Sequence, residues 1–225
     1  MRVLAIDTAL ANCAAAVLDD SEAHPCQTEC GAEIGRGHAE RLMNMIGEVM
    51  AESSTAFKDL DRVIVTTGPG SFTGLRVGLS VARGFGLVLE KPVVGVTTLA
   101  ALARSVAGSA DGDPILVALD GKADEVYCQL FHSDGTPLDE PEVKSLTALA
   151  SGLPAGIRFA GSAARRVAEA CGLGPDRVLS ERSYPDIADV ARLGMESDPR
   201  SAAAVPLYLR PPDAKPATSG RIERQ

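Results

Sequence analysis

A glycine-rich loop is the stretch of the sequence whose residue types most clearly indicate chemistry. It follows the β-branched run 63–67 and reads Gly68-Pro69-Gly70-Ser71-Phe72-Thr73-Gly74-Leu75-Arg76-Val77-Gly78. A strand, a tight turn and a helix N-terminus in this order present backbone N–H groups and the positive end of a helix dipole to an anion. Ser71 and Thr73 can cap the helix, and Arg76 can meet a phosphate or carboxylate. The spacing differs from a Walker loop, which needs a lysine followed by Ser or Thr.

Two aspartates, each at the end of an apolar strand, form a second candidate site. Asp7 ends the first of these strands and Asp120 ends the other. Facing one another across a cleft, such carboxylates suit a metal and phosphate site of the actin and sugar-kinase type. Those sites use a glycine-rich hairpin after the first aspartate, and the turn 7–12 contains no glycine. We therefore expect a degraded or shallow nucleotide site with weak or no intrinsic ATPase activity. The candidate nucleotide or anion residues are Asp7, Thr8, Gly70, Ser71, Thr73, Arg76 and Asp120.

Other catalytic arrangements find little support. The three histidines, His24, His38 and His132, are far apart and form no His-x-x-x-His pattern, so we predict no metal site. No Gly-x-Ser-x-Gly elbow is present. Cys13 and Cys128 lie in apolar strands, where inert core thiols are typical. We predict no catalytic residues.

Composition narrows the class of protein. The chain has 225 residues, a formal charge of -8 and 45% hydrophobic residues. An acidic chain is not expected to bind nucleic acid or an anionic membrane by itself, because binding to phosphates depends on clustered Lys and Arg. Its five cysteines contain no C-x-x-C pair, which favours reduced thiols. The first apolar run is too short for a signal peptide and no window is apolar enough to cross a membrane. We expect a cytoplasmic protein with no membrane partner.

The apolar pattern predicts an α/β chain. Apolar residues at three- and four-residue spacing, such as Leu42, Met45, Ile46 and Val49, indicate helices with one apolar face. Helices are predicted at 38–52, 72–89, 98–107, 145–150, 163–171 and 187–195. Strands are predicted at 2–7, 12–18, a short run near 26, 62–67, 92–96, 115–120, 125–131, 158–160 and 205–210.

The two halves of the chain open alike, since in each an apolar strand ends in aspartate and a second strand returns. A weak internal duplication is plausible, although chance likeness between two strand ends would produce the same pattern. A small, polar stretch near 108–114 is typical of a connection. We predict an N-terminal lobe of residues 1–108, a C-terminal lobe of residues 109–210 and a disordered tail of residues 211–225.

The helix predicted at 72–89 carries small residues on one flank. Gly74, Gly78, Ala82 and Gly86 recur every fourth residue, and each interior glycine costs about 1 kcal/mol relative to alanine. A close neighbour must offset that cost. The neighbour is either the chain's own sheet, another of its helices, or a partner protein.

Several segments resemble the TsaB (YeaZ) family. They are Leu4 to Thr8, His38 to Leu42, Gly68 to Gly78, Gly95 to Leu99, Leu119-Asp120 with Glu125 to Tyr127, and Pro206 to Arg210. The resemblance implies an actin-like ATPase (ASKHA) fold of class α/β, with two ribonuclease H-like lobes. It also implies a role in making N6-threonylcarbamoyladenosine at position 37 of tRNAs that read codons beginning with A. In that family the protein is a non-catalytic scaffold that activates its partners.

The resemblance also implies partners. They are a TsaD-type transferase and a TsaE-type ATPase, with a homodimer when the protein is alone, tRNA contacted only through the complex, and ATP or ADP at a subunit interface rather than as an intrinsic cofactor. Thr98 and Leu102 stand where the transferase carries its metal-binding histidines, and neither can replace an imidazole. The expected partner interface is Leu42, Met45, Ile46, Gly74, Leu75, Gly78, Leu79, Ala82, Arg83 and Gly86.

From this interface we expect Gly78→Leu to weaken partner binding and to leave the monomer folded. Alternatives from other classes are an ASKHA-type ATP-dependent phosphotransferase and a glycoprotease-like metallopeptidase.

Overall fold

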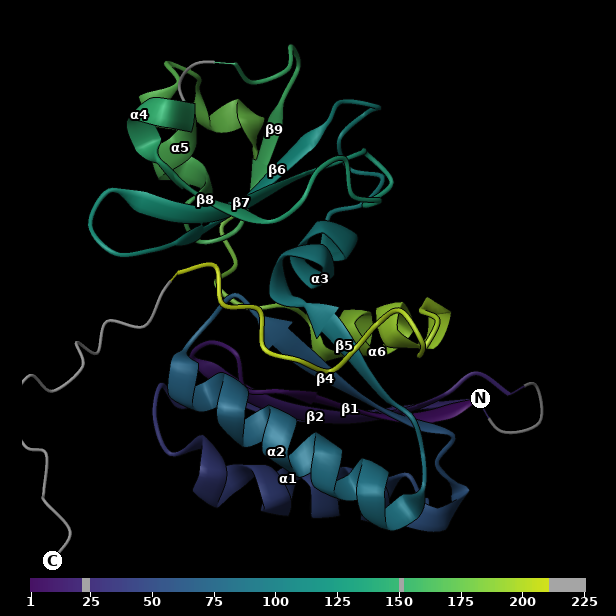
Figure 1. Ribbon diagram of the computed structural model, residues 1–225. Helices are drawn as coiled ribbons and strands as arrows, with labels where there is room; N and C mark the ends of the chain where they lie inside the picture. The colour runs from purple at the N-terminus through teal and green to yellow at the C-terminus, as the bar shows by residue number, and fades with distance from the viewer. Residues whose placement is uncertain (22–24, 150–151, 211–225) are drawn as a thin grey trace, which may run out of the picture.

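The computed structural model describes residues 1–21, 25–149 and 152–210, and it forms two lobes, each with a five-stranded sheet (Figure 1). The first sheet has the order β3 (Cys26–Glu33), β2 (Asn12–Asp19), β1 (Arg2–Asp7), β4 (Arg62–Gly68) and β5 (Val93–Thr97). The second has the order β10 (Val178–Ser180), β9 (Arg158–Ala160), β6 (Ile115–Asp120), β7 (Glu125–Phe131) and β8 (Glu142–Ser145).

The second sheet repeats the first when it is followed from the opposite edge. In both lobes the first three strands in the chain pair antiparallel, and the first strand also pairs parallel with the fourth. The fifth strand extends this parallel part. The two lobes therefore share one strand order, and the arrangement is the actin-like one of two ribonuclease H-like lobes that the resemblance implies.

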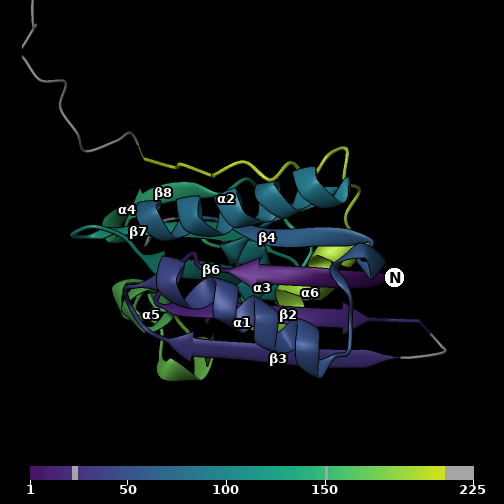
Figure 2. The same cartoon turned by 90° about the horizontal axis from the view of Figure 1, so that it is seen from below.

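Two long helices, α1 (His38–Glu52) and α2 (Phe72–Leu89), cover one face of the first sheet (Figure 2). Both have the predicted bounds. The apolar face of α1 is buried against the sheet, as its spacing predicts. The buried core beneath the helices includes Leu4, Ile6, Leu42, Ile46, Val63, Val65, Leu75 and Leu79.

The other face of the first sheet is covered by a helix from the end of the chain. Ile187, Val190 and Ala191 of α6 (Ile187–Glu196) share a buried cluster with β1, β2, β4 and β5. Helix α3 (Thr98–Ser105) lies between the lobes and packs mainly on the second sheet. The predicted boundary at residues 108 and 109 is therefore wrong for α6, because the apolar side of this helix is satisfied by the first lobe.

The opposite face of the second sheet packs on α4 (Leu146–Leu149) and α5 (Ala164–Ala170). Short 3-10 turns occur at η1 (Phe57–Asp59) and η2 (Pro175–Arg177).

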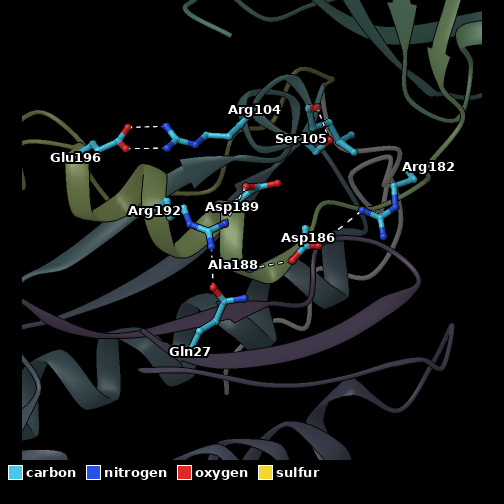
Figure 3. A network of polar contacts seen from close by, with 10 residues as sticks. Gln27, Arg104, Ser105, Arg182, Asp186, Ala188, Asp189, Arg192 and Glu196 are labelled. Carbon is cyan, nitrogen blue, oxygen red and sulfur yellow. Dashed lines mark hydrogen bonds and ion pairs between the residues drawn. The ribbon is translucent and has the colours of Figure 1, made fainter. Parts of the chain in front are cut away.

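Polar contacts fix α6 at the junction of the lobes (Figure 3). The Arg104 guanidinium of α3 donates to both carboxylate oxygens of Glu196, at 2.6 and 2.8 Å. Arg192 reaches from α6 to the Gln27 amide oxygen on β3, at 2.7 Å. At the C-terminal end of α6, Arg62 Nη1 lies 2.7 to 3.3 Å from three carbonyl oxygens. A cation at this end also opposes the helix dipole.

The last described segment differs from its prediction. The predicted strand 205–210 is extended chain without a strand ladder in the described part of the structure, and we call residues 202–210 the strap. It makes one isolated bridge, Val94 with Ala203. Pro206 has no N–H to donate, which interrupts any ladder. The sequence also gave no signal for β8 and β10, which are four and three residues long. The predicted tail 211–225, His24 and Ala150 lie outside the described residues.

Arg62→Ala should lower the free energy of unfolding by about 2 kcal/mol, because the carbonyl groups at the end of α6 lose a charged donor. Urea denaturation followed by circular dichroism measures this. Arg200→Ala is the matched control, because Arg200 is exposed and pairs only locally with Asp198 among the described residues. Equal stability of wild type and Arg62→Ala would contradict the assigned role of Arg62.

Candidate functional site

The glycine-rich loop and the start of α2 pack directly on the turn that follows β1. The Ser71 N–H donates to the Ala9 carbonyl oxygen at 2.6 Å, and the Thr8 hydroxyl donates to the Gly74 carbonyl oxygen at 2.8 Å. A Cβ atom at Gly70 would overlap the Ala9 carbonyl, and one at Gly74 would overlap the Thr8 carbonyl. The glycines of this loop therefore permit contact with the chain's own first strand.

The same contact continues along α2. A Cβ at Gly78 would overlap the Thr8 hydroxyl, and one at Gly86 would overlap the Val93 side chain. Ala82 is fully buried. Of the neighbours that the sequence left open, the one that explains this flank is the chain's own sheet.

Asp7 is sealed beneath this contact. Its side chain is 0% exposed, and Oδ1 accepts hydrogen bonds from the Thr66 hydroxyl at 2.6 Å and the Ala9 N–H at 3.0 Å. Oδ2 is buried without a hydrogen-bond partner among the described residues. Burial raises the pKa of the carboxyl group above its usual value. Asp7 and Thr8, both predicted as possible nucleotide or anion residues, are buried, and Thr8 lies against Gly74 and Gly78 of α2.

A hollow of ≈ 250 Å³ lies between the lobes. It brings together Gly70 and Ser71 from the first lobe with Asp120 from the second. The Asp120 carboxylate pairs with Arg166 of α5, and its N–H donates to the Ser162 hydroxyl at 3.0 Å. Ligand pockets usually measure about 300 to 1,000 Å³, so this hollow is small for a nucleotide.

Thr73 and Arg76, the remaining candidates for an anion site, line a different hollow on the outer side of α2. The Arg76 guanidinium lies 3.8 Å from the centre of the Phe72 ring, and its Nε donates to the Tyr208 hydroxyl at 3.4 Å. The predicted nucleotide or anion residues are thus divided among a sealed position, the hollow between the lobes and the outer side of α2.

The predicted partner interface is wrong for most of its residues. Those of α1 and α2 with apolar or small side chains are buried in the first lobe, where a docking protein cannot reach them: Leu42, Met45, Ile46, Gly74, Leu75, Gly78, Leu79 and Ala82. Gly86 is half-buried against β5. Arg83 is exposed, but its guanidinium donates to the Ala204 carbonyl oxygen at 3.0 and 2.6 Å.

The outward side of the helix pair carries an apolar surface that the sequence reasoning missed. Leu87 and Val88 are 82% and 79% exposed, and Met43 and Phe72 are about half exposed. Gly84 lies on this side, where an added Cβ would meet no atom within 4 Å of the described chain. An interior helix glycine without an internal packing reason still costs about 1 kcal/mol. We call Met43, Phe72, Gly84, Leu87 and Val88 the outer face.

The expectation that no window is apolar enough to cross a membrane is wrong for α2, which is long and apolar enough by length and composition alone. This apolarity has two sources, since one side of the helix packs on the sheet and the other side forms the outer face.

The described residues hold no group of three His, Cys, Asp or Glu side chains arranged to bind a metal. Thr98 and Leu102, at the positions where the resemblance places the transferase's metal-binding histidines, are both buried. Burial raises the pKa of the Cys13 and Cys128 thiols to about 11, which disfavours a nucleophilic thiolate.

Comparison with known proteins gives a consistent assignment. A family model described as TsaD, tRNA N6-adenosine threonylcarbamoyltransferase, matches residues 32–181. The chain is 34% identical over 134 residues to the tRNA threonylcarbamoyladenosine biosynthesis protein TsaB of Escherichia coli, covering 60% of this chain and 56% of that protein. It is 36% identical over 219 residues to an uncharacterized protein of Mycobacterium leprae, covering 96% of this chain and 57% of that protein. The match therefore spans little more than half the length of these two relatives.

The fold also matches a solved structure. YeaZ of Pseudomonas aeruginosa superposes with a TM-score of 0.76 at 24% identity, covering 92% of this chain and 99% of that one.

The packing of α2 reverses the expected effect of Gly78→Leu. The new side chain would displace Thr8, so we expect the monomer to lose more than about 2 kcal/mol of unfolding free energy. Gly84→Leu is the matched control and should keep or raise stability, since leucine favours helix. Thermal and urea unfolding of both variants measure this. A fully stable Gly78→Leu monomer would refute the packing argument.

Asp7 should make the protein less stable as pH rises. Because its folded pKa is raised above the unfolded value of ~3.9, between these two pKa values the folded state keeps a proton that the unfolded state has released. The stability that Asp7 contributes is complete below the unfolded pKa and is lost as pH rises through the folded pKa. The stability of Asp7→Asn relative to wild type should therefore increase from about pH 4 upward, in urea titrations at each pH.

Asp198→Asn serves as a control of opposite sign, because Arg200 lowers the pKa of Asp198. Its stability relative to wild type should fall as pH rises. An Asp7→Asn difference that does not change with pH would contradict the burial argument.

Proposed function

The chain belongs to the TsaB (YeaZ) family, and from this premise we propose that it is a non-catalytic subunit of the machinery that forms N6-threonylcarbamoyladenosine in tRNA. The observation that carries the proposal is the seal over Asp7. In an actin-like nucleotide site this aspartate and the turn after it would face phosphate, whereas here Asp7 is buried and the Gly70 and Ser71 backbone packs against Ala9 of that turn. In this proposal the chain promotes tRNA modification by binding the catalytic subunit and performs no reaction itself.

A TsaD-type transferase is the proposed catalytic partner, and a TsaE-type ATPase joins the pair. The outer face supplies the docking surface, because Leu87 and Val88 are adjacent, large and mostly exposed, as apolar residues at protein interfaces are. Without its partner, the same face would pair two copies of the chain. Gly84 would let a partner backbone approach α2 closely. This would explain a glycine at a helix position where the packing of the monomer does not require one.

Contact with tRNA is proposed to occur through the complex. The chain is acidic overall, and several arginines of its second lobe are already paired with carboxylates: Arg158 with Asp113, Arg165 with Glu181, Arg166 with Asp120, and Arg182 with Asp186. These pairs neutralise cations that phosphates would otherwise attract. The five cysteines are free thiols, which supports a reducing, cytoplasmic setting.

Reconstitution tests the function. Unmodified tRNA is incubated with the TsaD-type and TsaE-type partners, ATP and the threonylcarbamoyl donor, with and without this chain, and modified adenosine is measured by mass spectrometry. We expect modification only when the chain is present, and none from the chain alone. Full modification without the chain, or modification by the isolated chain, would overturn the proposal.

The docking surface is tested by Gly84→Leu and Leu87→Glu. Each should weaken binding to the TsaD-type partner tenfold or more, equivalent to about 1.4 kcal/mol, because the first blocks close approach and the second buries a charge. Calorimetric titration measures the affinity. Leu138→Glu is the control, since Leu138 is 45% exposed in the second lobe. Wild-type affinity for both test variants would exclude this surface.

A further inference from the structure

The strap, residues 202–210, contacts both lobes close to the hollow between them. On the first lobe, the Gly95 N–H donates to the Ala202 carbonyl at 2.9 Å and the Leu207 N–H donates to the Thr67 carbonyl at 2.8 Å. On the second lobe, Arg210 Nη1 lies 3.3 Å from Glu125 Oε2. Figure 1 shows the strap in yellow, passing β5 and rising toward the second lobe. This segment therefore contacts both lobes.

These contact points lie next to the two walls of the hollow. Thr67 directly precedes the loop that contributes Pro69, Gly70 and Ser71, and Glu125 follows the turn that contributes Asp120 and Lys122. The strap is thus attached beside one wall through Leu207 and beside the other through Arg210. Its length therefore limits how far the two walls can separate.

Three side chains on one flank of α2 hold the strap. Arg83 donates to the Ala204 carbonyl, the Phe72 and Tyr208 rings lie 5.4 Å apart, and Arg76 bonds the Tyr208 hydroxyl. Positions 72, 76 and 83 are four and seven residues apart, which places them on the same side of a helix. Phe72 also belongs to the outer face, so a protein that docks there touches a residue that contacts the strap.

The strap is held by few and exposed contacts. Val205 and Tyr208 are 56% and 46% exposed, and the ties to either lobe are isolated hydrogen bonds and one ion pair rather than a ladder. Segments of this kind open with small free energies. A contact that buries Phe72 and Tyr208 would stabilise the closed strap.

We infer that the strap is a clasp that sets how far the lobes open around the hollow, and that a partner docked on α2 tightens it through Phe72 and Tyr208. The first part concerns the free chain alone. The second part rests on the proposed function, because it requires the TsaD-type partner on the outer face.

The free chain tests the clasp. Spin labels on ketone-bearing residues at position 44 of α1 and position 140 of the second lobe report the distance between the lobes by double electron–electron resonance. Arg210→Ala and Tyr208→Ala should each give a longer mean distance and a broader distribution. Arg165→Ala, which breaks an exposed pair within the second lobe, should match wild type. Distributions identical to wild type for both test variants would overturn the clasp.

Adding the TsaD-type partner tests the coupling. The wild-type distribution should narrow, and that of Arg210→Ala should narrow less, at saturating partner in both cases. Equal narrowing in the two proteins would overturn the coupling and leave the clasp standing. If titration shows that the partner does not bind wild type, the proposed function fails instead, and the measurements on the free chain still decide the clasp.

Discussion

The contact between the start of α2 and the end of β1 is the constraint on which the rest of the structure depends. Ser71 and Gly74 form hydrogen bonds with Ala9 and Thr8 across this contact, and a side chain at position 70, 74 or 78 would overlap Ala9 or Thr8. Protein interiors are packed so densely that one added methyl group is felt at such a position. The spacing of Gly70, Gly74 and Gly78 therefore follows from the close packing of this segment on the turn after β1.

This contact divides α2 into an inner and an outer side with different tasks. The inner side seals Asp7, whose second carboxylate oxygen is left without a hydrogen-bond partner among the described residues. A buried polar atom of this kind is costly, and it stands where a phosphate site would need an open carboxylate. The outer side carries large apolar residues that are exposed to water, an arrangement that does not stabilise the isolated chain.

The sequence predicted the bounds of α1 and α2, because their apolar spacing is regular and Ser71 marks the start of α2. The similar openings of the two halves left the duplication open, because chance likeness between two strand ends produces the same pattern, and the strand order of the two sheets decides it. The sequence failed on the partner interface because α2 is apolar on both sides, and periodicity alone does not say which side faces the sheet. Gly78 and Gly84 look alike in the sequence and differ only in what surrounds them. The placement of α6 on the first lobe was equally hidden, since it depends on a contact between distant parts of the chain.

Calorimetric titration of the isolated chain with ATP and magnesium tests the sealed site most directly. The account predicts no saturable heat at nucleotide concentrations up to the millimolar range, because Asp7 and Thr8 are closed to a ligand. Stoichiometric binding that disappears in Asp7→Asn would contradict it, since that result requires an open first-lobe site.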